Sequence, residues 1–159
     1  MPAKLISAAQ RGFALMETMI GVLLIAIGIL AVLALQGTSI AQSRDAKYRS
    51  EASFAAMELL ATISANADRS TAVATSTTVC LFRLNSANAN SPGCAVPGAR
   101  PPQLASWLTR MTNMLPNAPA AAQTIDVDAA AGNRVTITMS WQSPQDTSRR
   151  NFVLVGVVN

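Results

Sequence analysis

One carboxylate, Glu17, stands near the start of a long apolar run, and its position is the first that suggests chemistry. Glu17 follows Phe13 by four positions, and Phe13 directly follows Gly12. From Met19 to Leu35 no side chain is charged or strongly polar. An unpaired carboxylate at the edge of such a run is costly in a membrane and usually marks a functional residue. The plain alternative is an ordinary membrane anchor whose Glu17 lies among the lipid headgroups.

The other side chains with distinctive chemistry are Cys80 and Cys94, the two cysteines of the chain. In a chain exported from the cytoplasm, such a pair is best explained as a disulfide. Closing a loop of about 15 residues would stabilise the fold by roughly 3 kcal/mol through the unfolded state. A structural metal is the competing interpretation, but two cysteines without histidine leave a zinc site half empty. We therefore predict a disulfide and no metal site.

Residues suited to catalysis are scarce. Histidine is absent, which excludes histidine-based triads and most catalytic zinc sites. The remaining Asp and Glu residues are scattered and form no cluster that resembles a metal or acid–base site. We therefore expect neither an enzyme nor a bound cofactor. A membrane-anchored periplasmic enzyme is the less favoured alternative, and it would need a cluster of polar catalytic groups.

The charge balance gives no argument for nucleic-acid binding. The 159 residues carry a formal net charge of +4, which falls to +2 when residues 1–12, with Lys4 and Arg11, are left out. So small an excess does not indicate a polyanionic partner, and no basic stripe with interleaved aromatic residues is present. The length allows one modest domain besides an anchor.

The apolar run, counted from Phe13, reaches the roughly 20 residues that a helix needs to cross a hydrocarbon core. Lys4 and Arg11 precede it and no acidic residue precedes Glu17, so the N-terminus is expected to stay in the cytoplasm. The apolar core of a secretory signal peptide is shorter, about 7–15 residues. We therefore expect residues 13–36 to be retained as a single transmembrane segment that carries a periplasmic head.

One long helix is predicted over residues 13–66, because no proline occurs between Phe13 and Pro92. Its second half carries an apolar face at helical spacing, formed by Ala52, Ala55, Ala56, Leu59, Leu60 and Ile63. Gly21 and Gly28 either let membrane helices approach closely or are simply tolerated there. A mixed charged band, expected to be solvated just outside the bilayer, comprises Arg44, Asp45, Lys47, Arg49 and Glu51.

Residues 67–159 are predicted to form a globular head. Residues 69–102, rich in small and polar residues, predict a long irregular loop with one possible strand at 79–82. A short helix is expected between Pro101 and Pro116, with one apolar face formed by Leu104, Trp107, Leu108, Met111 and Leu115. Trp107 on such a face is interpreted as a core residue rather than a ligand platform.

The last third of the chain predicts strands at residues 124–128, 135–141 and 152–158, the last two pairing as a hairpin. The charges of the connecting loop, Asp146, Arg149 and Arg150, are expected to be solvated. Such a sheet can cover the apolar face of the long helix. The predicted fold class is therefore α+β, with a long N-terminal helix packed on a small antiparallel sheet.

The N-terminal sequence resembles the class III signal of type IV pilins and type II secretion pseudopilins. It has a short basic leader that ends in Gly12, then Phe13, a Glu at the fifth position after the glycine, and an unbroken apolar run. The resemblance implies that prepilin peptidase cuts between Gly12 and Phe13, removes the cytoplasmic leader 1–12, and N-methylates Phe13. Ala14 and Met16 depart from the residues usual in the family, but both lie outside the Gly-Phe-x-x-x-Glu core.

The resemblance also gives Glu17 a role in assembly. It implies that the Glu17 carboxylate pairs with the Phe13 amine of a neighbouring subunit as that subunit leaves the bilayer. After cleavage the amine is a positive charge at a helix N-terminus, and Glu17 lies one turn away. A negative side chain there favours the helix dipole by about 0.3–1 kcal/mol.

More narrowly, the chain resembles the PilV, or type IV pilus modification, class of minor pilins. The matching stretches are Gly28 to Gln36, the charged neck with Arg49-Ser50, and Ala65-Asn66 at the end of the helix. This resemblance implies a type IV pilin-like fold and a low-abundance subunit that primes pilus assembly at or near the tip. Such a subunit would support adhesion, twitching motility or DNA uptake.

The implied partners are prepilin peptidase, other minor and major pilins, the inner-membrane assembly platform and inner-membrane lipid. The protein would span the inner membrane once before assembly and lie in the pilus at the cell surface afterwards. A minor pseudopilin of a type II secretion system is the alternative, because its N-terminal helix would have the same sequence pattern. Neighbouring genes for pilus or secretion components would separate the two.

Overall fold

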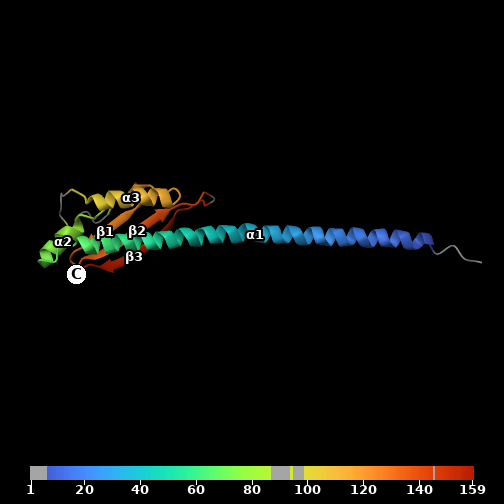
Figure 1. Ribbon diagram of the computed structural model, residues 1–159, viewed down its shortest axis with the longest axis horizontal. Helices are drawn as coiled ribbons and strands as arrows, with labels where there is room; N and C mark the ends of the chain where they lie inside the picture. Colours follow the sequence, from blue (N-terminus) through green and yellow to red (C-terminus); the bar gives the residue numbers. More distant parts are fainter. Residues whose placement is uncertain (1–6, 87–93, 95–98, 145) are drawn as a thin grey trace, which may run out of the picture. The chain divides into compact units, whose positions relative to one another are not determined.

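The chain folds into one long helix and a small mixed α/β unit, as the predicted α+β class requires (Figure 1). The structure, a computed structural model, describes residues 7–86, 94, 99–144 and 146–159. The helices are α1 (Ser7–Asn66), α2 (Ala72–Cys80) and α3 (Pro102–Met114), with a 3-10 turn η1 (Ala120–Ala122). The strands are β1 (Thr124–Asp128), β2 (Arg134–Trp141) and β3 (Arg150–Val157). Residues up to Arg44 form one unit, and residues from Asp45 onward form the other.

Helix α1 ends at Asn66, as predicted, but begins at Ser7, six residues before Phe13. The helical backbone therefore extends into the predicted leader, whose residues 1–6 lie outside the described residues. At its other end the Asn66 side-chain amide donates to the Thr62 carbonyl oxygen at 2.8 Å. This bond occupies one of the carbonyls that a helix end leaves without a backbone partner.

The three strands form one antiparallel sheet in the order β1-β2-β3. β2 alternates between buried and more exposed residues, as expected for a strand with one face on the core. Because opposed residues point to the same face, the pairing of Ile137 with Leu154 and of Met139 with Phe152 directs these four side chains together. The two strands pair as a hairpin, as predicted from the alternating sequence.

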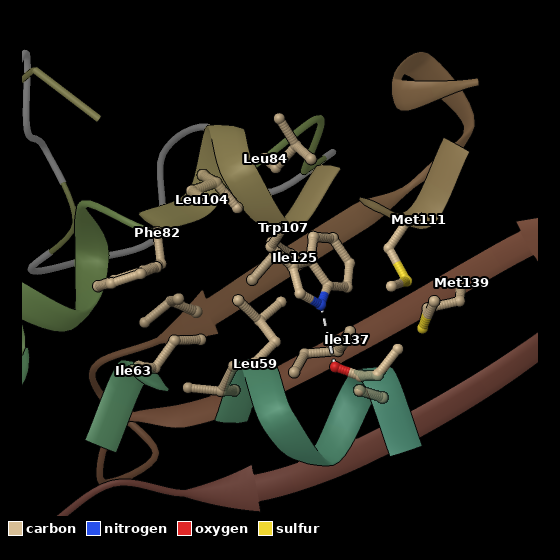
Figure 2. Packing of buried hydrophobic residues seen from close by; sticks show 14 of the residues in the cluster. Leu59, Ile63, Phe82, Leu84, Leu104, Trp107, Met111, Ile125, Ile137 and Met139 are labelled. Carbon is tan, nitrogen blue, oxygen red and sulfur yellow. Dashed lines mark hydrogen bonds between the residues drawn. The ribbon is translucent and has the colours of Figure 1, made fainter. Parts of the chain in front are cut away.

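Helices α1 and α3 pack on one face of this sheet, where Figure 2 shows their side chains meeting those of the strands. The predicted apolar face of α1 is confirmed: five of its six residues are buried and Leu60 is half-buried. The predicted face of α3 is confirmed as well, with Trp107 only 2% exposed. The largest buried side chains of the cluster are Leu59, Ile63, Phe82, Leu104, Met111, Leu115, Ile125, Ile137, Met139 and Trp141.

A glycine of the edge strand β3 lies against the side chain of Leu60 on α1. A Cβ atom built at Gly156 of β3 would lie 2.5 Å from the Leu60 Cδ2 atom. Real Cβ contacts are longer, so any larger residue at this position requires Leu60 or the strand to shift. Gly156 therefore lets the edge strand approach the helix.

The prediction of an irregular loop over residues 69–102 with a strand at 79–82 was wrong for residues 72–82, and its residues 87–93 and 95–98 lie outside the described residues. Residues 72–80 form helix α2, in which Thr75, Val79 and Cys80 are buried. Thr71 caps the helix, since its hydroxyl accepts a hydrogen bond from the Ala74 backbone N–H at 3.0 Å. The short polar residues that suggested a loop instead bond to backbone carbonyls one turn earlier, as Thr77 does to Val73 at 2.8 Å. Among the described residues of this segment, Leu84 pairs with the sheet through a bridge to Ile125.

Candidate functional site

The predicted processing site lies on helix α1, which carries Gly12 and Phe13 next to each other and Glu17 one turn later. The side chains of Phe13 and Glu17 are exposed. Within the part of the chain that the structure describes, the Glu17 carboxylate makes no ion pair or hydrogen bond. Glu17 is therefore an exposed carboxylate without a partner among the described side chains.

The helix that carries these residues is long and apolar enough to cross a membrane. Between Phe13 and Asn66 it contains an 18-residue window with a mean hydropathy of 2.8, none of which is buried within the protein. A Cβ atom at Gly21 or Gly28 would meet nothing within 4 Å. If either glycine serves close packing, the packing partner is another molecule.

The charged band after the apolar run is not simply solvated, which corrects the prediction for Asp45, Asp146 and Arg150. Arg150 Nη1 lies 2.7 Å from Asp45 Oδ2, and Arg150 Nε lies 2.7 Å from Asp146 Oδ2. The hydrogen bond to Asp146 raises the pKa of the Arg150 guanidinium above its usual value, and the Asp45 charge acts in the same direction. Asp45 and Arg150 are 105 residues apart, so no local pattern could have revealed the pair.

Of the remaining charges of the band and of the β2–β3 loop, Arg44, Lys47, Arg49 and Arg149 are exposed and Glu51 is half-buried. Lys47 and Glu51 form an ion pair one turn apart on α1, at 3.7 Å. Arg49 is exposed and, among the described residues, makes no ion pair. Arg149 donates to the Asn117 carbonyl oxygen at 3.2 Å.

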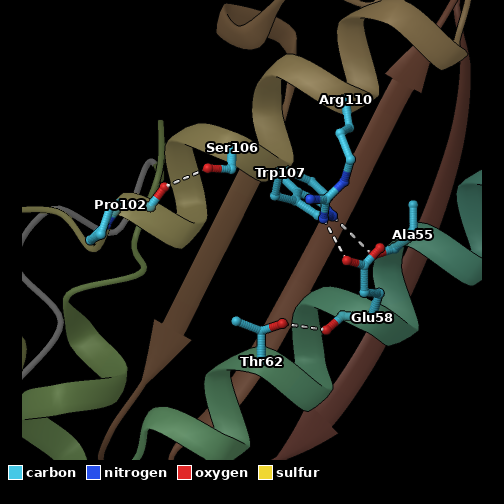
Figure 3. Close-up of polar contacts among 7 residues, drawn as sticks. All are labelled: Ala55, Glu58, Thr62, Pro102, Ser106, Trp107 and Arg110. Atoms are coloured by element: carbon cyan, nitrogen blue, oxygen red, sulfur yellow. Dashed lines mark hydrogen bonds and ion pairs between the residues drawn. The ribbon is translucent and has the colours of Figure 1, made fainter.

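Two polar contacts join α3 to α1 beside the hydrophobic core (Figure 3). The buried Trp107 Nε1–H donates to the Ala55 carbonyl oxygen at 3.0 Å. Arg110 forms an exposed ion pair with Glu58 one turn further along α1. Trp107 is thus a core residue with a satisfied polar atom, in agreement with its interpretation from the sequence.

The predicted disulfide is present and joins Cys80 to Cys94. Cys80 ends α2, and both cysteines are buried. The Arg83 guanidinium donates to the Cys94 carbonyl oxygen at 3.0 Å, which adds a second connection across the same loop. The disulfide therefore fixes the segment after α2 to the core near β1.

Two further side chains, Gln123 and Arg69, join distant segments through hydrogen bonds to backbone groups, and the sequence analysis predicted neither contact. The fully buried Gln123 side chain bonds both backbone groups of Ser140: its amide donates to the carbonyl and its oxygen accepts from the N–H, each at 2.9 Å. Arg69 joins the end of α1 to the end of the chain, because it donates to the carbonyls of Ser64 at 2.8 Å and Asn159 at 2.9 Å. Nothing in the sequence around Gln123, between Ala122 and Thr124, distinguishes it from an exposed glutamine.

Among the described residues no group of three or more Cys, Asp or Glu side chains is arranged to hold a metal ion. The fold therefore offers, within those residues, a helix long and apolar enough to cross a membrane, which carries a carboxylate without a partner there, and a head braced by a disulfide. Comparison with family models, curated proteins and solved structures gives no match for this chain.

Proposed function

We propose that this chain is a minor type IV pilin of the PilV class. It would be a structural subunit that primes pilus assembly and is incorporated at or near the pilus tip. The observation that carries the proposal is the placement of Gly12, Phe13 and Glu17 at the start of one continuous helix that is apolar enough to span a membrane. Adhesion, twitching motility and DNA uptake are the activities such a subunit supports.

The unpartnered carboxylate supports an assembly role over that of a simple anchor. A single anchored chain gains nothing from a charge near its membrane segment, because an apolar residue inserts more easily. In a filament, packed helices would surround Glu17, and an uncompensated buried charge costs several kcal/mol. A neighbouring Phe13 amine, freed by cleavage after Gly12, supplies the opposite charge at the same depth.

The head has the features that export and assembly require. The Cys80–Cys94 disulfide suits an oxidising compartment outside the cytoplasm. The three-stranded sheet buries the apolar face of the second half of α1, which leaves the opposite side of that helix, including Phe54 at 69% exposure, free for neighbouring subunits. Met57, three residues further along the helix, is 52% exposed, and grouped exposed apolar side chains mark interaction sites.

The test is the mass and location of the protein from its native host. We expect the purified protein to begin at an N-methylated Phe13 and to be found in sheared pili as well as in the membrane. Recovery of the intact chain, with residues 1–12 retained in a strain that has prepilin peptidase, would overturn the proposal. A processed protein that is absent from pili but needed for secretion would identify the pseudopilin alternative.

A further inference from the structure

Strand β3 has a free edge. It is the last strand in the order β1-β2-β3, so β2 lies on one side of it and no strand of the described chain lies on the other (Figure 1). The proposed filament chemistry at Phe13 and Glu17 does not use this edge. Its backbone groups and its side chains together indicate what kind of partner it accepts.

The hydrogen-bond pattern shows which backbone groups face the free edge. Just beyond β3, the Val158 N–H donates to the Asn133 carbonyl oxygen at 3.2 Å, a pair that continues the register of the β2–β3 ladder. Backbone groups of successive residues in an antiparallel strand point alternately to its two sides. The mutual bonds of Leu84 and Ile125 give the same alternation when it is followed across β2. Even-numbered residues of β3 therefore face β2, and the odd-numbered ones face the free edge: Asn151, Val153, Val155 and Val157.

Nothing in the sequence protects this edge. Residues 151–158 contain no charged residue and no proline, and the described pairing of β3 with β2 runs without a bulge. Within the described residues, the backbone groups that face the edge make no hydrogen bond. Natural proteins usually protect an edge strand with charges, proline or a bulge, because an open edge is a template for another strand. Strand β3 is therefore open to extension of the sheet.

An added strand would meet apolar side chains on both faces of the sheet. On the outer face, Val153, Val155 and Val157 are 52%, 56% and 55% exposed. On the inner face, Phe152 and Leu154 are half-buried, although the residues that they oppose on β2 are fully buried. A strand with apolar neighbours on both faces is itself apolar along its whole length. The side chains therefore favour an apolar, β-branched segment.

Positive charge without an acidic partner lies near both ends of the edge. Arg49 of α1 lies near Asn151 at the start of β3, since both line one shallow hollow. Arg69 donates to the Asn159 carbonyl oxygen just beyond the end of β3. Neither guanidinium makes an ion pair within the described residues. An uncharged edge between two cations is complementary to an apolar strand with an acidic residue at each end.

We propose that the free edge of β3 binds an extended segment of another protein, which adds a fourth strand to the sheet. The segment is apolar and β-branched in its middle and acidic at its ends. Its main chain bonds to the odd-numbered residues of β3, and its side chains provide specificity, as in other complexes formed by strand addition. A helix does not fit this edge, because its backbone groups already bond within the helix.

Amide hydrogen exchange tests the edge with an internal control. The probe is a short blocked peptide of valine and threonine with an aspartate at each end. One matched peptide has a lysine at each end, and another has a proline in the centre. The ¹⁵N-labelled full chain, in detergent micelles, is measured by NMR with and without each peptide.

We expect the aspartate peptide, at saturation, to slow exchange of the Val153, Val155 and Val157 amides about tenfold. The Leu154 and Gly156 amides already face β2, so their exchange should not change. The proposal is overturned by unchanged exchange, by slowing of consecutive rather than alternate amides, or by equal binding of either matched peptide. Protection that needs no peptide and rises with protein concentration would assign the edge to a second copy of the chain, which also overturns it.

Two variants separate the backbone from the side chains. Val155→Pro removes an N–H that faces the edge but no bond to β2, so it should fold and bind the aspartate peptide about tenfold more weakly. Val155→Thr is the matched control, because it keeps the N–H and the β-branched shape, and its binding should change little. Urea unfolding checks that both variants fold, and Val153→Pro replaces Val155→Pro if that variant does not. Equal losses in the proline and threonine variants would overturn the proposal, because binding would then depend on the apolar face alone.

The source of the strand is read from pilus fractions, and this arm rests on the proposed function. If a neighbouring pilin supplies the strand, Val155→Pro should reduce incorporation into sheared pili and Val155→Thr should not. Normal incorporation of Val155→Pro, together with its weakened peptide binding, would assign the strand to a protein outside the filament. Because the exchange measurement needs no pilus, its result stands even if the chain proves not to be a pilin.

Discussion

The indole Nε1–H of Trp107 donates a 3.0 Å hydrogen bond to the backbone carbonyl of Ala55 in the buried contact between α3 and α1. A tryptophan on an amphipathic helix brings a large apolar surface, but its N–H needs an acceptor when it is buried. The carbonyl of the neighbouring helix supplies that acceptor. The pair therefore fixes both the spacing and the register of the two helices on the sheet.

Trp107→Phe should destabilise the head more than Trp141→Phe does. Both substitutions remove an indole that is at most 2% exposed, but only Trp107 loses a hydrogen bond within the described chain. The difference in the free energy of unfolding should be about 1 kcal/mol. Urea unfolding of the full chain, followed by fluorescence of the remaining tryptophan, measures both variants. Equal losses would show that the Ala55 bond contributes nothing.

Asp45 and Arg150 should couple energetically, although weakly. Their side chains are 31% and 46% exposed, and exposed ion pairs are worth about 0.2–1 kcal/mol. A double-mutant cycle of Asp45→Asn and Arg150→Gln measures the coupling. Arg149→Gln, next in sequence but bonded to a backbone carbonyl, is the control and should be additive with Asp45→Asn. We expect the coupling to shrink as salt is raised; a coupling of zero at low salt contradicts the pair.

The elements that the sequence predicted correctly are those with a strict period. The apolar face of α3 and the alternation of Val135, Ile137 and Met139 each report one buried side of a regular element. The end of α1 at Asn66 was also predictable, since small and polar residues follow it. The disulfide could be predicted because two cysteines allow a single pairing.

The wrong prediction at α2 and the contacts that the sequence did not predict have different physical causes. In α2 the serines and threonines suggested a loop, whereas a Thr71 cap and burial of Val79 and Cys80 outweigh their weak helix propensity. In the charged neck the sequence shows only that Asp45 is polar, and the fold alone brings Arg150 to it. The buried Trp141 N–H, which has no acceptor among the described residues, is likewise a property of packing, which a strand pattern cannot report.

Replacement of both cysteines by serine should lower the free energy of unfolding by about 2–4 kcal/mol, because the Cys80–Cys94 bond restricts the unfolded chain. Reduction of the wild-type protein should cause a similar loss, and the serine variant should not respond to reductant. Alkylation of unreduced, unfolded protein gives the independent check: quantitative labelling of both thiols in protein from the periplasm or pilus would exclude the bond.

Gly156→Ala and Leu60→Ala should not be additive. The alanine Cβ would lie 2.5 Å from Leu60 Cδ2, and such overpacking costs typically 1–3 kcal/mol. With Leu60 shortened to alanine, the clashing atom is gone and the substitution at position 156 should cost little. Unfolding of the two single variants and the double variant tests this. Additive losses would mean that Leu60 moves aside freely.

Glu17→Ala separates an assembly subunit from a simple anchor. The substitution removes a carboxylate that has no partner in the described chain, so membrane insertion should be normal. If the carboxylate neutralises a neighbour's Phe13 amine in packed helices, incorporation into sheared pili, or pilus number, should fall. Glu17→Asp should give an intermediate result, because its shorter side chain keeps the charge but reaches less far.

Glu51→Ala is the matched control for this experiment, since it removes the same charge from the same helix beyond the apolar run, where Glu51 pairs with Lys47 among the described residues. Immunoblots of membrane and sheared-pilus fractions compare the three variants with wild type. Reduced incorporation of Glu17→Ala with normal incorporation of Glu51→Ala would tie the defect to the charge within the membrane-spanning region. Equal incorporation of wild type and Glu17→Ala would show that the helix acts only as an anchor. If Glu17 paired with a neighbour's Phe13 amine, its loss would leave that amine unpaired among packed helices, and incorporation would fall.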